Sequence, residues 1–256
     1  MLPIKIDKPD EIVYQVADIF IRECHNVLKE YPELYTDEVK DKIKIIRSSY
    51  LISCVNNLIS GANKNSRWSV RQIKDSVNSY KKRWDHVTFI TETVYTNDEN
   101  DKFIIKEILV KIIYDALVDD VLTNIHRIND YIELVKIDAR HEIGHVLDAL
   151  KCQQTMSFSE YQKMRKTDDV AMCEHIKTTD QMIEDFKNEK EKHTDEEWNA
   201  LFKEMDRLYY STPGEWRADT LGKIDREKWL DFQYNYNMPD KIEIRPIYKG
   251  ADKNAK

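Results

Sequence analysis

Residues 130–151 predict a helix that must contact protein on two sides, and this segment constrains the fold more than any other. Its apolar residues recur at helical spacing and form one stripe: Ile132, Val135, Ala139, Ile143, Val146 and Leu150. The opposite side carries Leu134 and Ile137, and the charged residues occupy a narrow strip between the two sides. A surface helix has a single apolar stripe, so we expect this helix to pack against protein on both sides.

The rest of the chain is predicted to be mostly α-helical with a small sheet, an α+β fold. Glycine and proline, which interrupt helices, number only five and six among 256 residues. Helices are predicted at 8–31, 36–61 with Thr36 as its cap, from Ser66 or Ser69 to 84, 102–128, in several segments between 157 and 210, at 213–224 and at 226–234. Strands are predicted at 86–96, before a turn at 97–101, and at 241–248, while 103–105 could instead extend a hairpin. We divide the chain into an N-terminal helical region, 1–84, and a second region, 85–256.

Charge and hydropathy exclude some classes of partner. The net charge is −7, which argues against binding of nucleic acid through a broad basic surface. No apolar run approaches the roughly 18–20 residues of a membrane span, and the first residues lack the pattern of a secretory signal. The four cysteines form no CxxC pair, which favours reduced thiols and a cytoplasmic location.

The central helix carries the sequence HEIGH at residues 141–145. Residues four apart in an α-helix point the same way, so His141 and His145 can both reach one metal ion. Glu142 is displaced around the helix and can reach a water at that ion, which is the physical content of the HExxH pattern of zinc peptidases. Gly144 costs about 1 kcal/mol relative to alanine inside a helix and is tolerated where a neighbour approaches closely. The alternative is a core helix with two hydrogen-bonded histidines.

A second segment, STPGEWRADTLGK at 211–223, is the best source of a third ligand. Catalytic zinc takes three protein ligands and keeps one position open. On a helix one face of this segment would present Glu215, Ala218, Asp219 and Gly222. Three of the five glycines of the chain (Gly144, Gly214 and Gly222) fall in the two segments, which predicts that the two helices meet closely.

HEIGH followed by EWRAD resembles the gluzincin zinc peptidases, whose pattern is HExxH followed by ExxxD and of which thermolysin is a member. The second motif is most similar to the group containing the CAAX-prenyl and heat-shock membrane proteases. The resemblance covers these two helices only, and this chain lacks the membrane spans of that group. It implies a zincin-like catalytic region in 85–256, with Zn²⁺ bound by His141, His145 and Glu215. It also implies that Glu142 is the general base and that Asp219 holds His141 through its second ring nitrogen.

Several assignments stay open on sequence alone. Thr212 and Glu215 also fit a capping box, in which the glutamate would serve only the helix start. Glu174 and His175 are rival ligands nearer to HEIGH. Asp148 is a poor one because it lies on the same helix. The donors that could stabilise an oxyanion are Tyr209, Tyr210, His175, His193, Arg217 and Tyr248.

We therefore expect a zinc metallopeptidase that acts on a protein or peptide. Strand 86–96 could hold an extended substrate at the edge of the sheet, or it could be a plain structural strand. The alternative function is a helical structural or interaction protein, of a phage particle for example, with a relic or purely structural zinc site. In that case the location would be the virion.

Overall fold

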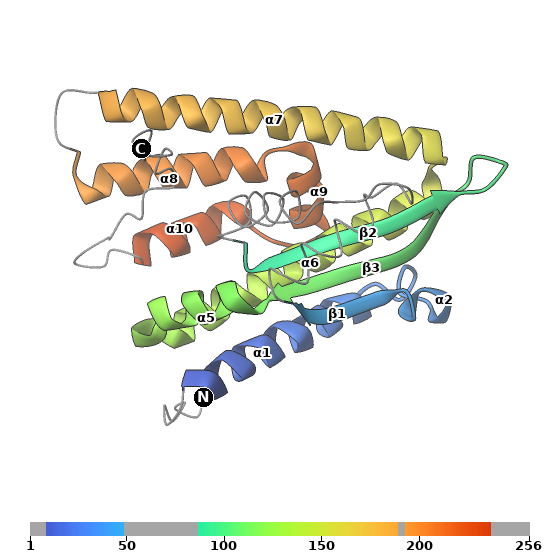
Figure 1. The fold of residues 1–256 in the computed structure, drawn as a ribbon, viewed down its shortest axis with the longest axis horizontal. Helices are drawn as coiled ribbons and strands as arrows, with labels where there is room; N and C mark the ends of the chain where they lie inside the picture. The colour runs from blue at the N-terminus through green and yellow to red at the C-terminus, as the bar shows by residue number, and fades with distance from the viewer. Residues whose placement is uncertain (1–8, 49–86, 189–192, 237–256) are drawn as a thin grey trace, which may run out of the picture.

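The computed structural model describes residues 9–48, 87–188 and 193–236, and this part of the chain is mostly helical with a small sheet (Figure 1). The fold class expected from the sequence is thereby confirmed. The helices are α1 (Pro9–Lys29), α2 (Asp37–Lys40), α5 (Tyr114–Thr123), α6 (Ile128–Thr155), α7 (Phe158–Asn188), α8 (Asp195–Tyr210), α9 (Pro213–Gly222) and α10 (Arg226–Tyr236). A short 3-10 helix, Ile125–Arg127, joins α5 to α6.

The sheet has the strand order β1-β3-β2. Its strands are β1 (Ile43–Ser48), β2 (Phe89–Asn97) and β3 (Phe103–Ile113). The central strand β3 pairs in parallel with β1 and antiparallel with β2. The predicted strand at 86–96 and the turn after it are confirmed. In that turn Asp98 Oδ1 accepts hydrogen bonds from the backbone N–H groups of Asn100 and Lys102, both at 2.9 Å.

The predicted helix at 102–128 is wrong in its first half, where β3 lies instead. Isoleucine and valine fill this segment, and β-branched side chains favour strands. The apolar residues of β3 form a nearly continuous run rather than a strictly alternating one, and most of them are buried. Such a run can be mistaken for a buried helix. Only Tyr114–Thr123, as α5, keeps the helical conformation before the 3-10 turn.

The predicted helix at 36–61 is also wrong, because it stops after α2 and gives way to β1. Thr36 does precede the helix, but its side chain makes no capping hydrogen bond. The segment Ile43–Ser48 is again rich in isoleucine, and it completes the open edge of β3. The remainder of that prediction, the helix expected to end at 84 and the strand at 241–248 lie outside the described residues.

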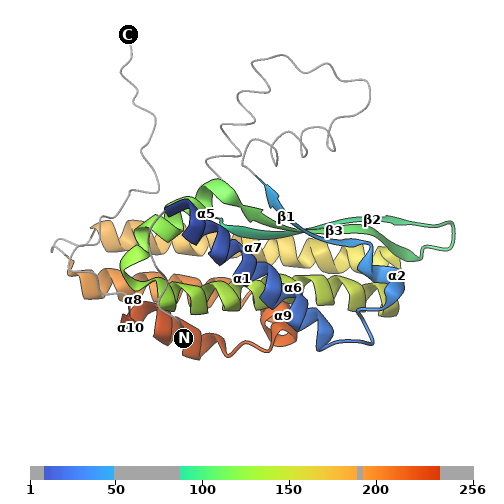
Figure 2. The ribbon, with the colours of Figure 1, turned by 90° about the horizontal axis from the view of Figure 1, so that it is seen from below.

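Helix α6 lies against the sheet on one side and against α1 and α9 on others (Figures 1 and 2). Most of its predicted apolar stripe is buried: Val135, Ala139, Ile143 and Val146 have no exposed surface, while Ile132 is partly buried. Residues of α1 share this core, where the Phe20 ring stacks on Phe89 of β2 at 4.0 Å between centroids. Thus α1 and β1 pack with the elements that follow 87, while the division at 84/85 stays a prediction.

The sequence predicts several charged helices between 157 and 210. The described residues of this range form two helices, α7 and α8. They lie side by side, and α8 also contacts α9 and α10 (Figure 1). A capping box of Thr194 and Glu197 starts α8. None of the described helices combines the length and the apolar character that a membrane span requires.

Helices α6 and α9 approach until their backbones touch, as the glycines of the two segments predict. A Cβ atom at Gly144 would lie 2.8 Å from Ala218 Cα and closer still to the Ala218 carbonyl. A Cβ at Gly222 would lie 2.6 Å from the carbonyl oxygen of Arg140. Real Cβ atoms do not approach backbone atoms so closely, and hence both positions require glycine for the helices to meet.

Gly144→Ala is expected to destabilise the protein by about 3 kcal/mol or more, at or above the upper end of overpacking costs, because rigid backbone opposes the new methyl group. Urea unfolding of the metal-free protein measures the change. Gly214→Ala is the matched control: its Cβ would meet nothing nearer than Asp168 Cγ at 3.6 Å, so a change within about 1 kcal/mol is expected. Equal stabilities of the Gly144 variant and the wild type would contradict this packing.

Candidate metal centre

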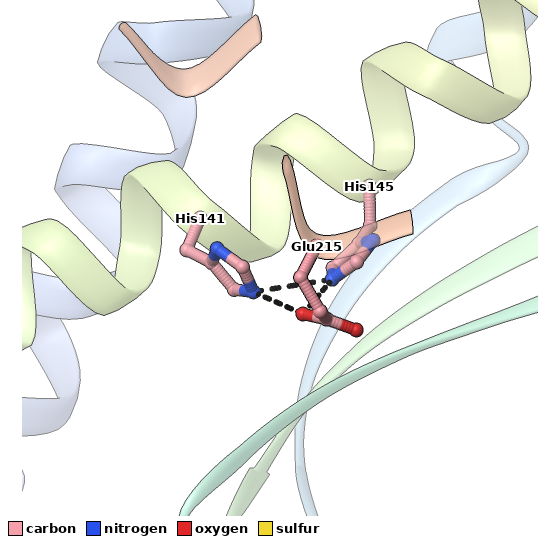
Figure 3. A group of neighbouring side chains, drawn as sticks. All are labelled: His141, His145 and Glu215. Carbon is pink, nitrogen blue, oxygen red and sulfur yellow. Dashed lines mark hydrogen bonds and ion pairs between the residues drawn. The ribbon is translucent and has the colours of Figure 1, made fainter. Parts of the chain in front are cut away.

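The structure brings together the three predicted ligands, two from α6 and one from the first turn of α9 (Figure 3). His141 Nε2 lies 2.9 Å from Glu215 Oε2, and His145 Nε2 lies 3.2 Å from His141 Nε2. His145 Nε2 is 3.3 Å from the same carboxylate oxygen. Among the described residues this is the one group of histidine, cysteine and acidic side chains with the proximity of a metal site.

The spacing of the donor atoms matches the edges of a coordination tetrahedron. Two ligands that each lie 2.0–2.1 Å from a tetrahedral zinc ion are about 3.3 Å apart. The observed separations of 2.9, 3.2 and 3.3 Å are close to that value. Three donors leave a fourth corner free, and His145, whose side chain is 26% exposed, is the most accessible of the three. The residues therefore fit a small divalent ion with one open position.

The charges of the ligand group also suit a cation. Burial lowers the pKa of His141, but the carboxylates of Asp219 and Glu215 outweigh it and raise that pKa to about 10. Burial raises the pKa of Glu215, but the two histidines reverse this and hold it well below its usual range. Glu215 and the histidines thus both favour a positive charge between them. Either a proton or a metal ion can supply that charge.

Asp219 lies where the resemblance implies, at the second nitrogen of His141. Its Oδ1 is 2.7 Å from His141 Nδ1. A carboxylate at this nitrogen keeps the ring proton there and leaves the Nε2 lone pair for a ligand bond. On its other side Asp219 accepts two hydrogen bonds from Arg226 of α10, at 2.8 and 2.6 Å. Arg226 is not predicted from the sequence, because it belongs to no motif and its only signal is its place soon after EWRAD.

Glu142 is buried beside the ligand group. Its charge acts on His141 and on Tyr209, raising the pKa of each. Its Oε2 is shielded from water and has no hydrogen-bond partner among the described residues. An unsatisfied buried carboxylate oxygen is costly and is a strong acceptor. The backbone oxygen of Glu142 accepts a hydrogen bond of 3.0 Å from Thr91 Oγ1, which ties the motif to β2.

Three of the possible oxyanion donors gather near the ligands. Tyr209 is close enough to Glu215 for burial, together with the charge of that carboxylate, to raise the pKa of its hydroxyl. The Tyr210 ring packs edge-on against His141, with centroids 5.4 Å apart. His175 of α7 lies 5.7 Å from the Tyr209 ring, its buried Nδ1 has no partner among the described residues, and burial lowers its pKa.

The remaining candidates are engaged elsewhere or not described. Arg217 forms ion pairs with Asp148 at 3.0 Å and Asp168 at 2.6 Å, joining α9 to α6 and α7. Asp148, the poor ligand candidate on α6, is therefore paired with Arg217 rather than with the ligand group. His193 contacts the backbone oxygen of Phe186, and Tyr248 lies outside the described residues.

The two competing assignments for the third ligand do not match the structure. Thr212 is the N-cap of α9, but its side chain makes no capping bond; its hydroxyl donates to the Tyr209 carbonyl at 2.8 Å. The alternative, a capping box of Thr212 and Glu215, does not form, and the Glu215 carboxylate faces the histidines instead. Glu174 is exposed on α7 and is not part of the ligand group.

Comparisons of the chain with protein-family models, curated proteins and solved structures found no match. The resemblance to gluzincins thus stays an expectation drawn from the two sequence motifs.

Loss of a residue that supports a metal ligand typically lowers metal affinity by about 10–100-fold. Glu215→Ala removes a ligand itself and is expected to lower zinc affinity by more than that. The two remaining ligands sit on one helix and supply only adjacent corners of the tetrahedron. Metal analysis after brief dialysis against a chelator should find one zinc per chain in the wild type and little in the variant. Glu174→Ala is the control and should keep its zinc. Zinc retained without Glu215 but lost without Glu174 would move the site to α7.

Proposed function

We propose that this protein is a zinc metallopeptidase of gluzincin type, with His141, His145 and Glu215 as ligands and Glu142 as general base. The single observation that carries the proposal is the ligand group itself. Donor atoms from two distant segments stand at tetrahedral spacing, and a buried glutamate with an unsatisfied oxygen lies beside them. Three protein ligands and an open corner are the arrangement of catalytic rather than structural zinc.

A zinc ion at this position would supply a Lewis acid that polarises the scissile carbonyl and acidifies water. Glu142 would take the proton from the attacking water and deliver it to the nitrogen of the leaving amine as the C–N bond breaks. Asp219 would keep the ring proton of His141 on Nδ1, away from the ligand position. Tyr209, Tyr210 and His175 lie near the ligand group and are our candidates for stabilising negative charge on the carbonyl oxygen.

The proposed substrate is a protein or peptide bound in extended form along β2. This strand is at the edge of the described sheet, and Thr91 joins it to the backbone of Glu142. A peptide that added as a further strand would run beside the motif helix, with its main chain hydrogen-bonded to β2. We further propose a reducing, cytoplasmic setting, since Cys24, Cys152 and Cys173 are all free thiols.

Glu142→Gln is expected to keep zinc and the fold but to slow hydrolysis by about 100-fold or more, because an amide cannot accept the proton. The zinc-loaded protein is incubated with peptides from a digested cell proteome, and new termini are counted by mass spectrometry. Glu174→Gln, at an exposed position of α7, should cleave like the wild type. Equal cleavage by wild type and Glu142→Gln would reject the general base. Bound zinc with no cleavage by either would favour the structural or interaction protein.

A further inference from the structure

We propose that Arg226 is a positioning residue of the metal centre, which fixes His141 by clamping Asp219. This inference rests on the proposed function, because it concerns the same ligand group. It adds a residue that neither motif contains, contributed by a separate helix, α10. Arg226 contacts Asp219, His141 and Tyr210, and both Asp219 and Tyr210 also lie against the His141 ring.

The guanidinium holds both oxygens of the Asp219 carboxylate. Arg226 Nε donates to Oδ2 at 2.8 Å, and Nη2 donates to Oδ1 at 2.6 Å. A two-point contact of this kind fixes the plane of the carboxylate as well as its position. Because Oδ1 is also the oxygen that faces His141 Nδ1, at 2.7 Å, the clamp sets the direction in which the imidazole points.

A second contact fixes the guanidinium itself. Its central carbon lies 3.5 Å from the centroid of the Tyr210 ring, in cation–π geometry. The same tyrosine ring packs edge-on against His141, with centroids 5.4 Å apart. Arg226 therefore contacts the carboxylate that orients His141 and the aromatic ring that flanks it.

The position is a costly one for an arginine whose role is only to stabilise its helix. Arg226 is the first residue of α10, where the helix dipole disfavours positive charge. Its side chain is only 14% exposed, so water solvates the cation poorly. The Asp219 carboxylate is 7% exposed and, without Arg226, would have its charge shared only with His141. The arginine is best explained by what it does to Asp219.

Helices α8 and α10 offer a matched control for general loosening. Arg207 of α8 pairs with Glu227 of α10, the residue next to Arg226, through hydrogen bonds of 2.8 and 3.0 Å. No contact of Arg207 involves Asp219, His141 or Tyr210 among the interactions described. Arg207→Met therefore weakens the attachment of α10 while leaving the clamp intact.

The test is a double-mutant cycle in zinc affinity, measured by competition with a chelating dye on the full chain. Asp219→Ala should weaken zinc binding by about 10–100-fold. Arg226→Met should weaken it by about 10-fold in the wild type and by clearly less in the Asp219→Ala background, because Arg226 acts mainly through Asp219. Its direct approach to His141, from Nη2 to Nδ1, is longer, at 3.4 Å. Arg226→Lys, which keeps the charge but not the fork, should recover the affinity only in part. Arg207→Met should bind zinc like the wild type.

The Co²⁺-loaded protein gives a second readout, since its visible absorption bands report ligand geometry. They should shift in Arg226→Met and Arg226→Lys but not in Arg207→Met, and Arg226→Lys keeps this readout usable if the methionine variant does not fold. Equal losses from Arg226→Met in both backgrounds, no loss at all, or an equal loss in Arg207→Met would overturn the inference while leaving the zinc site standing. A wild type that binds no zinc would overturn both the inference and the proposed function.

Discussion

The backbone contact between α6 and α9 is the constraint on which the candidate site depends. Glu215 reaches the two histidines only because nothing larger than a hydrogen stands at Gly144 and Gly222. One more carbon on either helix would separate their axes. Glu215, in the first turn of α9, could then no longer contact the histidines, because the length of its side chain is fixed. The close contact is therefore part of the site as well as part of the core.

The second constraint is the balance of charge around that contact. Glu142, Glu215 and Asp219 are buried within a short stretch of two helices, and burial raises the pKa of the neighbouring Asp138 to about 7. Among the described residues, Arg226 pairs with Asp219, and the two histidines lower the pKa of Glu215. A protein interior rarely holds so many carboxylates without a compensating cation. This excess of carboxylates suits the proposed metal ion, and the hydrogen bonds of Arg226 at 2.8 and 2.6 Å go to Asp219 rather than to the proposed ligands.

Sequence reasoning reached the helices and the ligand group because both are governed by local rules. The spacing of His141 and His145 is fixed by helix geometry, and the glycines signal a close neighbour wherever they interrupt a helix. It failed at β1 and β3, because the conformation of an isoleucine-rich run is decided by the strands that pair with it, and such pairing is not encoded within the run. It missed Arg226 for a similar reason: the partner of Asp219 is a neighbour only once α10 has folded back. The capping box at Thr212 is a local rule that was overridden, since the histidines compete for the same carboxylate.

The separation of the proposed ligands along the chain has a consequence for how the protein would acquire a metal ion. His141 and Glu215 are 74 residues apart, and α7 and α8 lie between them. Closing so long a loop carries an entropic cost that only completed packing offsets. The proposed ligand set is therefore complete only once α6 and α9 have packed together. An ion that binds only the complete set selects the native state by mass action. Metal uptake would then mark the end of maturation, and an unfinished chain would carry no competent centre.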